Sequence, residues 1–268
     1  MGAGIAHVLA DAGISVTVVE VSDEAVSAAE RRVTASVRGS AARGKLRSTE
    51  EGVLARVDVV PVQPSLAGVE LVVEALPERL ELKRSVLAAV EDALDADAIV
   101  ATNTSSLSIA ALAEALRRPE RLVGTHFFNP VPASVLVEVV RGPASGDRAV
   151  GLAHGLAARL GKETIEVADA PGFATSRLGV LLGLEAIRMV EEGVASPADV
   201  DRAMVLGYRH PMGPLRLGDL VGLDVRLGIA EYLATTLGPR FDPPALLRCM
   251  VAEGRLGQKS GQGFYAWD

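Results

Sequence analysis

A histidine and a glutamate in two short apolar segments are the residues of this chain best suited to proton transfer. His126 ends the segment 121–126, and Glu138 lies within the segment 135–140. Histidine suits this work because its pKa lies near neutral pH, and a neighbouring carboxylate fixes one ring tautomer and stabilises the imidazolium ion. Such a pair could take the hydroxyl proton of a secondary alcohol while hydride leaves the carbon. A structural role at two strands is the alternative, and the oxidation also needs a cofactor site.

A second polar segment, Asn103 to Ser106, follows the apolar segment 98–102. It precedes a helical pattern, so we expect it at the carboxyl end of a strand, where open α/β sheets bind their ligands. Ser105 could hydrogen-bond a reacting oxygen there. Capping of the next helix is the ordinary role of such a serine, and we assign that role to Ser106.

Both segments belong to a regular alternation of strands and helices. Segments rich in valine and isoleucine predict strands at 14–20, 57–60, 70–75, 98–102, 121–126 and 135–140. Apolar residues at helical spacing predict helices at 22–44 and 79–94. This alternation predicts an α/β fold with a doubly wound parallel sheet.

The pattern changes after residue 171. Only helical patterns follow, at 173–192, 196–206, 224–237 and 244–253. Ser196 and Pro197 form a good helix start, because serine accepts hydrogen bonds at an N-cap and proline fits the first turn. We therefore predict two domains, residues 1–171 for dinucleotide binding and residues 172–268 as an all-helical domain.

The N-terminus matches the end of a dinucleotide-binding fingerprint. A helix is predicted from Gly2 to Gly13. In a dinucleotide-binding unit, a strand and a G-x-G-x-x-G turn precede this helix, and the turn holds the pyrophosphate. Gly2 would be the last glycine of that turn, so the first strand and the first two glycines are missing. We expect the chain to start at an internal methionine of a longer reading frame, with a compensating segment as the alternative.

Glu20 ends the next predicted strand. An acidic side chain at this position accepts hydrogen bonds from the adenosine ribose hydroxyls and repels a 2′-phosphate, which favours NAD over NADP. A glycine-rich helix start and a solvated glutamate explain Gly2 and Glu20 equally well.

The composition limits the other classes of function. The chain has 268 residues and a net charge of -7, and an acidic protein is a poor match for nucleic acid. The single cysteine, Cys249, excludes an intramolecular disulfide and a multi-cysteine metal site, so we expect a cytoplasmic protein without a metal. No uncharged apolar run reaches the roughly 18 residues of a membrane span. Basic residues concentrate in 31–47, where they could meet phosphates or form a solvated helix face.

Six sequence strings together resemble the L-3-hydroxyacyl-CoA dehydrogenase family, which includes the 3-hydroxybutyryl-CoA dehydrogenases. They are NTSSLSI, HFFNPVP, LVEVV, DAPGF, HPMGP and GQKSGQGFYAW, and they occur in the family's order and spacing. The resemblance runs from Met1 to Asp268. It implies a Rossmann-like domain that lacks its first strand, followed by an all-helical domain for substrate binding and dimerisation, and a homodimer.

The resemblance also implies roles for individual residues. His126 would be the general base, Glu138 would orient it, and Ser105 would bind the substrate oxygen near the nicotinamide. Residues implied for NAD are Gly2, Glu20, Ala75, Glu78, Lys83, Asn103, Ser105, Asn129 and Lys259. Residues implied for the coenzyme A thioester are Ser36, Ser105 and Arg43, the last standing where the family commonly has lysine.

One departure from the family lies after the Pro-Gly-Phe string. The family usually has Asn-Arg there, whereas this chain has Ser176 before Arg177. The asparagine amide would help to hold the substrate carbonyl and the histidine, and serine is shorter. We therefore expect Ser176 to reduce or retune the activity without abolishing it.

Three alternatives stay open beside NAD-dependent oxidation of an (S)-3-hydroxyacyl-CoA. The same chemistry could act on a thioester of an acyl-carrier protein, which the basic segment 31–47 would tolerate. A free hydroxy acid could be the substrate. The chain could also be a non-catalytic thioester-binding remnant, because the glycine turn is absent.

Overall fold

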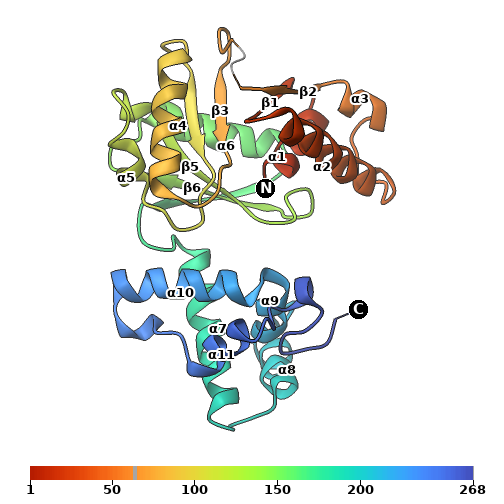
Figure 1. The fold of residues 1–268 in the computed structure, drawn as a ribbon, viewed down its shortest axis with the longest axis vertical. Coiled ribbons are helices and arrows are strands. Elements are labelled where there is room, and N and C mark those ends of the chain that lie inside the picture. The colour runs from red at the N-terminus through yellow and green to blue at the C-terminus, as the bar shows by residue number, and fades with distance from the viewer. Residues whose placement is uncertain (63–64, 268) are drawn as a thin grey trace. The chain divides into compact units, whose positions relative to one another are not determined.

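The computed structural model describes residues 1–62 and 65–267 of the chain. It contains two compact units, Met1–Asp169 and Ala170–Asp268. The first unit is α/β and the second is helical (Figure 1). The predicted fold class is confirmed. No helix in the described ranges is long and apolar enough to cross a membrane.

The first unit is built on two separate sheets. Strands β1 (Val16–Glu20) and β2 (Val57–Pro61) form a parallel pair. The second sheet has the order β3-β4-β5-β6-β7, with the bounds Leu71–Glu74, Ile99–Thr102, Leu122–Phe127, Leu136–Arg141 and Glu163–Ala168. Among the described strands, none pairs with the second edge of β1 or of β3. No described segment therefore replaces the strand that the resemblance expects before Gly2.

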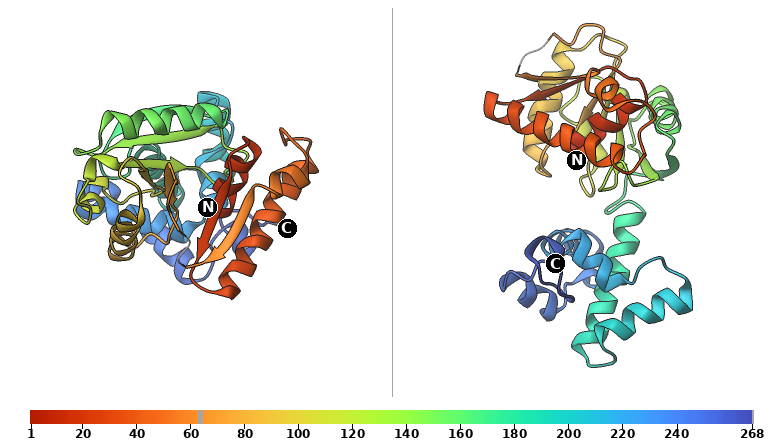
Figure 2. Two further views of the ribbon diagram at one scale, coloured as in Figure 1. Left: turned by 90° about the horizontal axis from the view of Figure 1, so that it is seen from above. Right: turned by 90° about the vertical axis from the view of Figure 1, so that its right-hand side faces the viewer.

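Helices cover both faces of the five-stranded sheet (Figure 2). Helix α6 (Asp147–Arg159) packs on one face, where its Ala149 and Ala153 meet Val123. Helix α5 lies on the other face, because a side chain at Gly124 would collide with Ile109. The other α-helices of this unit are α1 (Gly2–Asp11), α2 (Asp23–Ala41), α3 (Glu50–Leu54), α4 (Leu80–Ala93) and α5 (Ile109–Ala113), and a 3-10 helix (Pro119–Arg121) precedes β5.

Helix α1 packs in two directions. Its Ile5 and Leu9 join the apolar cluster on the five-stranded sheet. Its Ala6 and Ala10 join the cluster that α2 and α3 form with β1 and β2. Since residues four apart lie on one face of a helix, one face of α1 lies against the five-stranded sheet and Val16 of β1, and a second face lies against the β1–β2 pair.

The second unit packs five helices around a buried apolar cluster that includes Leu184, Leu223 and Leu233. The helices are α7 (Thr175–Glu191), α8 (Pro197–Tyr208), α9 (Pro214–Val221), α10 (Leu223–Leu237) and α11 (Ala245–Ala252). Ser196 caps α8 through the Asp199 amide, with Pro197 in the first turn. The described part of this unit contains no strand.

The sequence patterns missed three α-helices, one strand and one strand direction. Helix α3 has only five residues, too few to show a helical period. Helix α6 buries a face of mostly small residues, and β7 is an edge strand with Glu163 and Glu166 exposed, so neither gives a clear apolar period. Helix α9 starts inside a turn-like Gly-Pro string. The parallel sheet also has one antiparallel junction, between β5 and β6.

Candidate active site

The antiparallel junction places His126 directly opposite Glu138 in the register of β5 and β6. Directly opposed residues of an antiparallel pair project from the same face of the sheet. The side chains meet there, with His126 Nδ1 2.6 Å from Glu138 Oε2. His126 is 5% exposed and Glu138 is fully buried.

This contact selects one form of the imidazole ring. An ionised carboxylate only accepts hydrogen bonds, so Nδ1 carries the proton that His126 donates to Glu138. The neutral ring then has its basic lone pair on Nε2. Glu138 lies between two other strands, β5 and β7, so the sheet itself fixes the carboxylate.

Glu78 organises the turn that follows β4. Its Oε1 accepts hydrogen bonds from the Thr104 hydroxyl (2.5 Å), the Ser105 amide (2.9 Å) and the Ser106 amide (3.1 Å). Ser105 is half-buried, and Ser106 also donates its hydroxyl to Glu78. The expectation that Ser106 caps the next helix is wrong, because Ser108 is the N-cap of α5.

Asn103 joins this turn to the strand that carries the histidine. Its side-chain oxygen accepts a hydrogen bond from the Phe127 amide at 3.0 Å, and Phe127 follows His126 in the chain. Its backbone oxygen accepts one from the Lys83 ammonium at 3.1 Å. The segments that carry His126 and Ser105 are therefore connected through backbone and amide groups.

The remaining predicted cofactor residues of the first unit lie on several elements. A side chain at Gly2, the first residue of α1, would lie 3.7 Å from the Ala75 methyl group, which follows β3. Glu20, at the end of β1, is half-buried and has an ion pair with Arg32 at 3.7 Å. Asn129 is exposed in the loop after β5.

A buried histidine lies behind the predicted coenzyme A residues. His7 of α1 is 2% exposed, and its Nδ1 lies 2.8 Å from the Ser36 hydroxyl of α2. Burial lowers the pKa of His7, Asp11 opposes this shift, and Arg43 adds to it. Arg43 itself is exposed. The sequence assigned no partner to His7, because contacts between helices cannot be found from residue type alone.

The other predicted site residues belong to the second unit. Ser176 is half-buried in the first turn of α7. Lys259 pairs with Asp224 of α10 at 2.5 Å. Residues in or next to the strings HPMGP and GQKSGQGFYAW donate hydrogen bonds to two buried carboxylates.

Asp201 and Asp219 are these two carboxylates. Asp201 accepts the Leu215 and Arg216 amides at the start of α9, each at 2.8 Å, and the Tyr265 hydroxyl at 2.8 Å. Asp219 accepts the Phe264 and Tyr265 amides and the Trp267 indole. The carboxyl-terminal string is thus held to α8 and α9.

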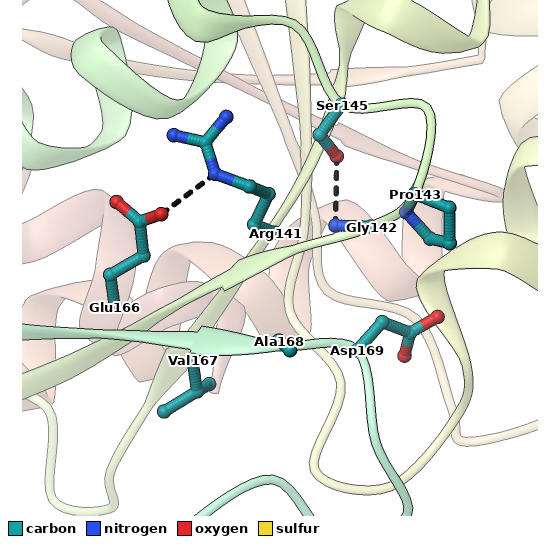
Figure 3. A pocket seen from close by; sticks show the side chains of 8 residues that line it. All are labelled: Arg141, Gly142, Pro143, Ser145, Glu166, Val167, Ala168 and Asp169. Carbon is teal, nitrogen blue, oxygen red and sulfur yellow. Dashed lines mark hydrogen bonds and ion pairs between the residues drawn. The ribbon is translucent and has the colours of Figure 1, made fainter.

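A surface hollow of the first unit contains none of the predicted site residues. It lies beside the ends of β6 and β7. Two short segments line it, one from Arg141 to Ser145 and one from Glu166 to Asp169 (Figure 3). Arg141 bonds to Glu166 at 2.7 Å and to Asp147 at 2.9 Å. Both carboxylates raise the pKa of Arg141, and the hydrogen bond to Glu166 has the larger effect. In the described ranges, no group of three or more His, Cys, Asp and Glu side chains could hold a metal.

Two family models match almost the whole chain. Residues 1–170 match the 3-hydroxyacyl-CoA dehydrogenase NAD binding domain, and residues 172–267 match the 3-hydroxyacyl-CoA dehydrogenase C-terminal domain. The chain belongs to the 3-hydroxyacyl-CoA dehydrogenase family. As a member, it is an oxidoreductase that uses NAD.

Known relatives agree over the full length of the chain. A probable 3-hydroxybutyryl-CoA dehydrogenase of Bacillus subtilis is 40% identical over 270 residues, covering 100% of this chain and 94% of that protein. The crystal structure of Mycobacterium tuberculosis FadB2 has a TM-score of 0.96 at 41% identity, covering 100% of this chain and 95% of the other. That of the (S)-3-hydroxybutyryl-CoA dehydrogenase PaaH1 from Ralstonia eutropha has a TM-score of 0.92 at 38% identity, with the same coverage.

Proposed function

We propose that this chain interconverts an (S)-3-hydroxyacyl-CoA and the 3-ketoacyl-CoA, with His126 as the general base. The observation that carries the proposal is the 2.6 Å bond between His126 Nδ1 and Glu138 Oε2. NAD supplies the hydride acceptor when bound. His126 takes the hydroxyl proton at Nε2, because Nδ1 already carries the proton shared with Glu138, and the carboxylate stabilises the imidazolium ion that results.

Ser105 binds the reacting oxygen of the substrate in this proposal. Its backbone amide donates a hydrogen bond to Glu78. This bond fixes the backbone that carries the Ser105 hydroxyl at the carboxyl end of β4. Ser176 stands where the family has asparagine, and its shorter side chain would hold the substrate carbonyl less well.

The residues of the first unit fit a dinucleotide. Helix α1 has no side-chain cap on its first amides, and free amides at a helix N-terminus favour a phosphate. Gly2 leaves room beside Ala75, and Glu20 suits the adenosine ribose. Glu78, Asn103 and Asn129 would complete this part of the cofactor site, to which the resemblance also assigns Lys83. Lys259 of the second unit is assigned to the cofactor by the resemblance.

Ser36 and Arg43 are the proposed contacts for the coenzyme A portion. Arg43 is exposed near the end of α2, where its guanidinium could pair with a phosphate. An acyl-carrier protein carries its thioester on a phosphopantetheine arm, so the same basic residues would suit it as the alternative partner.

The substrate is tested by following the loss of NADH absorbance. We expect oxidation of NADH with acetoacetyl-CoA, and slower or no oxidation with the acetoacetyl thioester of a carrier protein or with free acetoacetate. Faster turnover of the carrier-protein thioester would favour that alternative. Fluorescence titration with NADH tests the non-catalytic alternative, because a remnant would bind no cofactor.

The role of Ser176 is tested by the Ser176→Asn variant. We expect a higher kcat, by up to about 10²- to 10³-fold if the lost amide acts as an oxyanion donor, or by less if a water replaces it. Ser176→Ala serves as the matched control and should lower kcat. Unchanged turnover in Ser176→Asn would contradict the proposed role.

We also propose a cytoplasmic homodimer. The exposed Cys249 suits a reducing compartment. Support for the dimer comes from exposed apolar side chains on helices α7, α8 and α9 of the second unit, which are Leu178, Leu181, Leu182, Val205, Leu206, Leu217, Leu220 and Val221. On α7 and on α9 these residues recur at helical spacing, as expected for an interface between copies.

A further inference from the structure

A fully buried charge pair lies beside the turn that carries Ser105. Lys83 of α4 has no exposed side-chain surface, and the side chain of Glu74, at the end of β3, is 3% exposed. The Lys83 ammonium lies 2.7 and 2.9 Å from the two carboxylate oxygens of Glu74 and 3.1 Å from the Asn103 carbonyl oxygen. An ammonium has three donors, so these contacts use all of them.

The Glu74 carboxylate also uses its full hydrogen-bonding capacity. Besides Lys83, its carboxylate accepts the Thr102 hydroxyl at 2.6 Å and the Leu76 amide at 2.5 Å. Its backbone oxygen accepts the Asn103 amide at 2.7 Å. A carboxylate has about four acceptor sites, and four donors occupy them. A buried network of this kind is rigid when every member is paired.

The network reaches both proposed active-site segments. Asn103, held by Glu74 and Lys83, accepts the amide of Phe127, the residue after His126. Glu78, which holds the Ser105 turn, has its second oxygen 3.7 Å from the Lys83 ammonium. Lys83 therefore joins the carboxyl ends of β3 and β4, and the Asn103 side chain extends the link to β5.

We propose that Glu74 and Lys83 form a positioning pair, which sets the place of Asn103 and of the Ser105 turn without touching the cofactor. The inference rests on the proposed function, because it assumes that NAD binds at this edge of the sheet. Lys83 could reach a bound dinucleotide only by leaving a buried carboxylate, and separating a buried ion pair is strongly unfavourable. The role that the resemblance gives Lys83 would thus be exerted through Glu74 and Asn103.

The Glu74→Gln variant separates positioning from charge. This change removes a negative charge near an anionic ligand, so electrostatics alone predicts tighter NADH binding. Positioning predicts weaker binding, because the Lys83 ammonium loses its partner and Asn103 shifts. We expect the Kd for NADH, measured by fluorescence, to rise about tenfold, as small misplacements in a site are costly.

A double-mutant cycle tests whether Lys83 contacts the cofactor. We expect Lys83→Met to raise the Kd about tenfold alone, and the variant with both changes to return to within about threefold of the wild type, because no buried charge remains unpaired. Arg84→Met is the matched control, since Arg84 is the next residue of α4 and pairs with Glu81 and Glu114 outside the network. Its Kd should not change.

Three results would overturn the inference. They are tighter or unchanged binding in Glu74→Gln, the same loss from Lys83→Met with and without Glu74→Gln, and a lowered Tm with the Kd unchanged in all variants. Failure of the wild type to bind NADH would overturn the proposed function as well. If the single variants do not fold, Thr102→Val keeps the charge pair and removes one bond to Glu74. We expect its Kd to rise about threefold, and a wild-type Kd would also refute the inference.

Discussion

The bond between His126 and Glu138 gives the imidazole ring a fixed tautomer and a fixed plane. Both depend on a residue pair that faces across two strands. If the carboxylate became an amide, Nδ1 could be either donor or acceptor, and the imidazolium ion would lose its counter-charge. The position of the proton-accepting nitrogen of His126 therefore depends on Glu138 as well as on the histidine itself.

Glu138→Gln tests this pair with little change in shape. We expect kcat for acetoacetyl-CoA reduction to fall by about 10²- to 10⁴-fold, the usual contribution of general acid–base catalysis. The Kd for NADH should stay unchanged. Glu163→Gln, on the exposed edge strand, is the control and should keep wild-type turnover. A Glu138→Gln enzyme with normal kcat would refute the role of the carboxylate.

His7 makes the stability of the first unit depend on pH. Its pKa in the folded protein is lowered by burial, so below about pH 6.5 the unfolded chain binds a proton that the folded chain excludes. Stability from this group is therefore present above the unfolded pKa and falls as the pH drops toward the folded pKa. His7→Gln lacks this titration, and glutamine can still bond to Ser36.

Urea unfolding of the wild type and of His7→Gln at pH 7.5 and pH 5.5 measures this effect. We expect the wild type to lose more stability on acidification than the variant. His154→Gln is the control, because His154 is more exposed and lies beside Glu166, and it should not remove the loss. Equal losses in the wild type and in His7→Gln would contradict the assignment.

At the scale of elements, the type of most helices and strands followed from apolar periodicity, whereas their pairing did not. The residues His126, Glu138 and Ser105 could be chosen from the sequence, because His126 and Glu138 lie in predicted strands and Ser105 follows one. The reversal of β6 could not, since a buried strand has the same apolar pattern in either direction. The links from Glu74 to Lys83 and from His7 to Ser36 join elements distant in the chain, which no local pattern encodes.

The carboxyl-terminal string illustrates how a motif can serve packing. Gly257 has φ +94°, and a methyl group there would lie 2.2 Å from the Asp219 carbonyl oxygen. Asp219 in turn receives the amides of the string. The glycine is required because the two backbones approach so closely.

Gly257→Ala should lower the free energy of unfolding by about 3 kcal/mol or more, since strain and collision add. Gly254→Ala is the matched control, because Gly254 also has a positive φ of +73° but nothing within 4 Å of the added methyl. It should cost only about 1 to 2 kcal/mol. Equal midpoints of chemical denaturation for the two variants would show that the close approach is unimportant.

At the scale of the whole molecule, the family, the cofactor and the class of reaction follow from the sequence, whereas assembly does not. Helices α7, α8 and α9 carry exposed apolar side chains, and an apolar face formed by them would be costly to leave in water. A closed homodimer would cover it with the same face of a second copy.

Leu217→Glu places a charge in this face. We expect it to convert a dimer to a monomer in light scattering, because an unpaired buried carboxylate is strongly unfavourable. Ile165→Glu, on the exposed strand β7 of the first unit, is the control and should leave the mass unchanged. A wild type that is monomeric at high concentration would refute the proposed dimer.

Among the described residues, the two sheets of the first unit share no ladder of hydrogen bonds, and helix α1 packs against strands of both (Figure 1). Its Ile5 and Leu9 cluster with residues of the five-stranded sheet and with Val16 of β1, and its Ala6 and Ala10 cluster with residues of β1 and β2. No residue of β1 or β2 is fully buried, whereas every residue of β4 and β5 is buried, so the β1–β2 region could open as a sub-global unit while β4 and β5 stay folded. Amide hydrogens of β1 and β2 should then exchange with solvent sooner than those of the central strands. A dinucleotide that spans Glu20 and Asn103 would join the two sheets and slow that exchange.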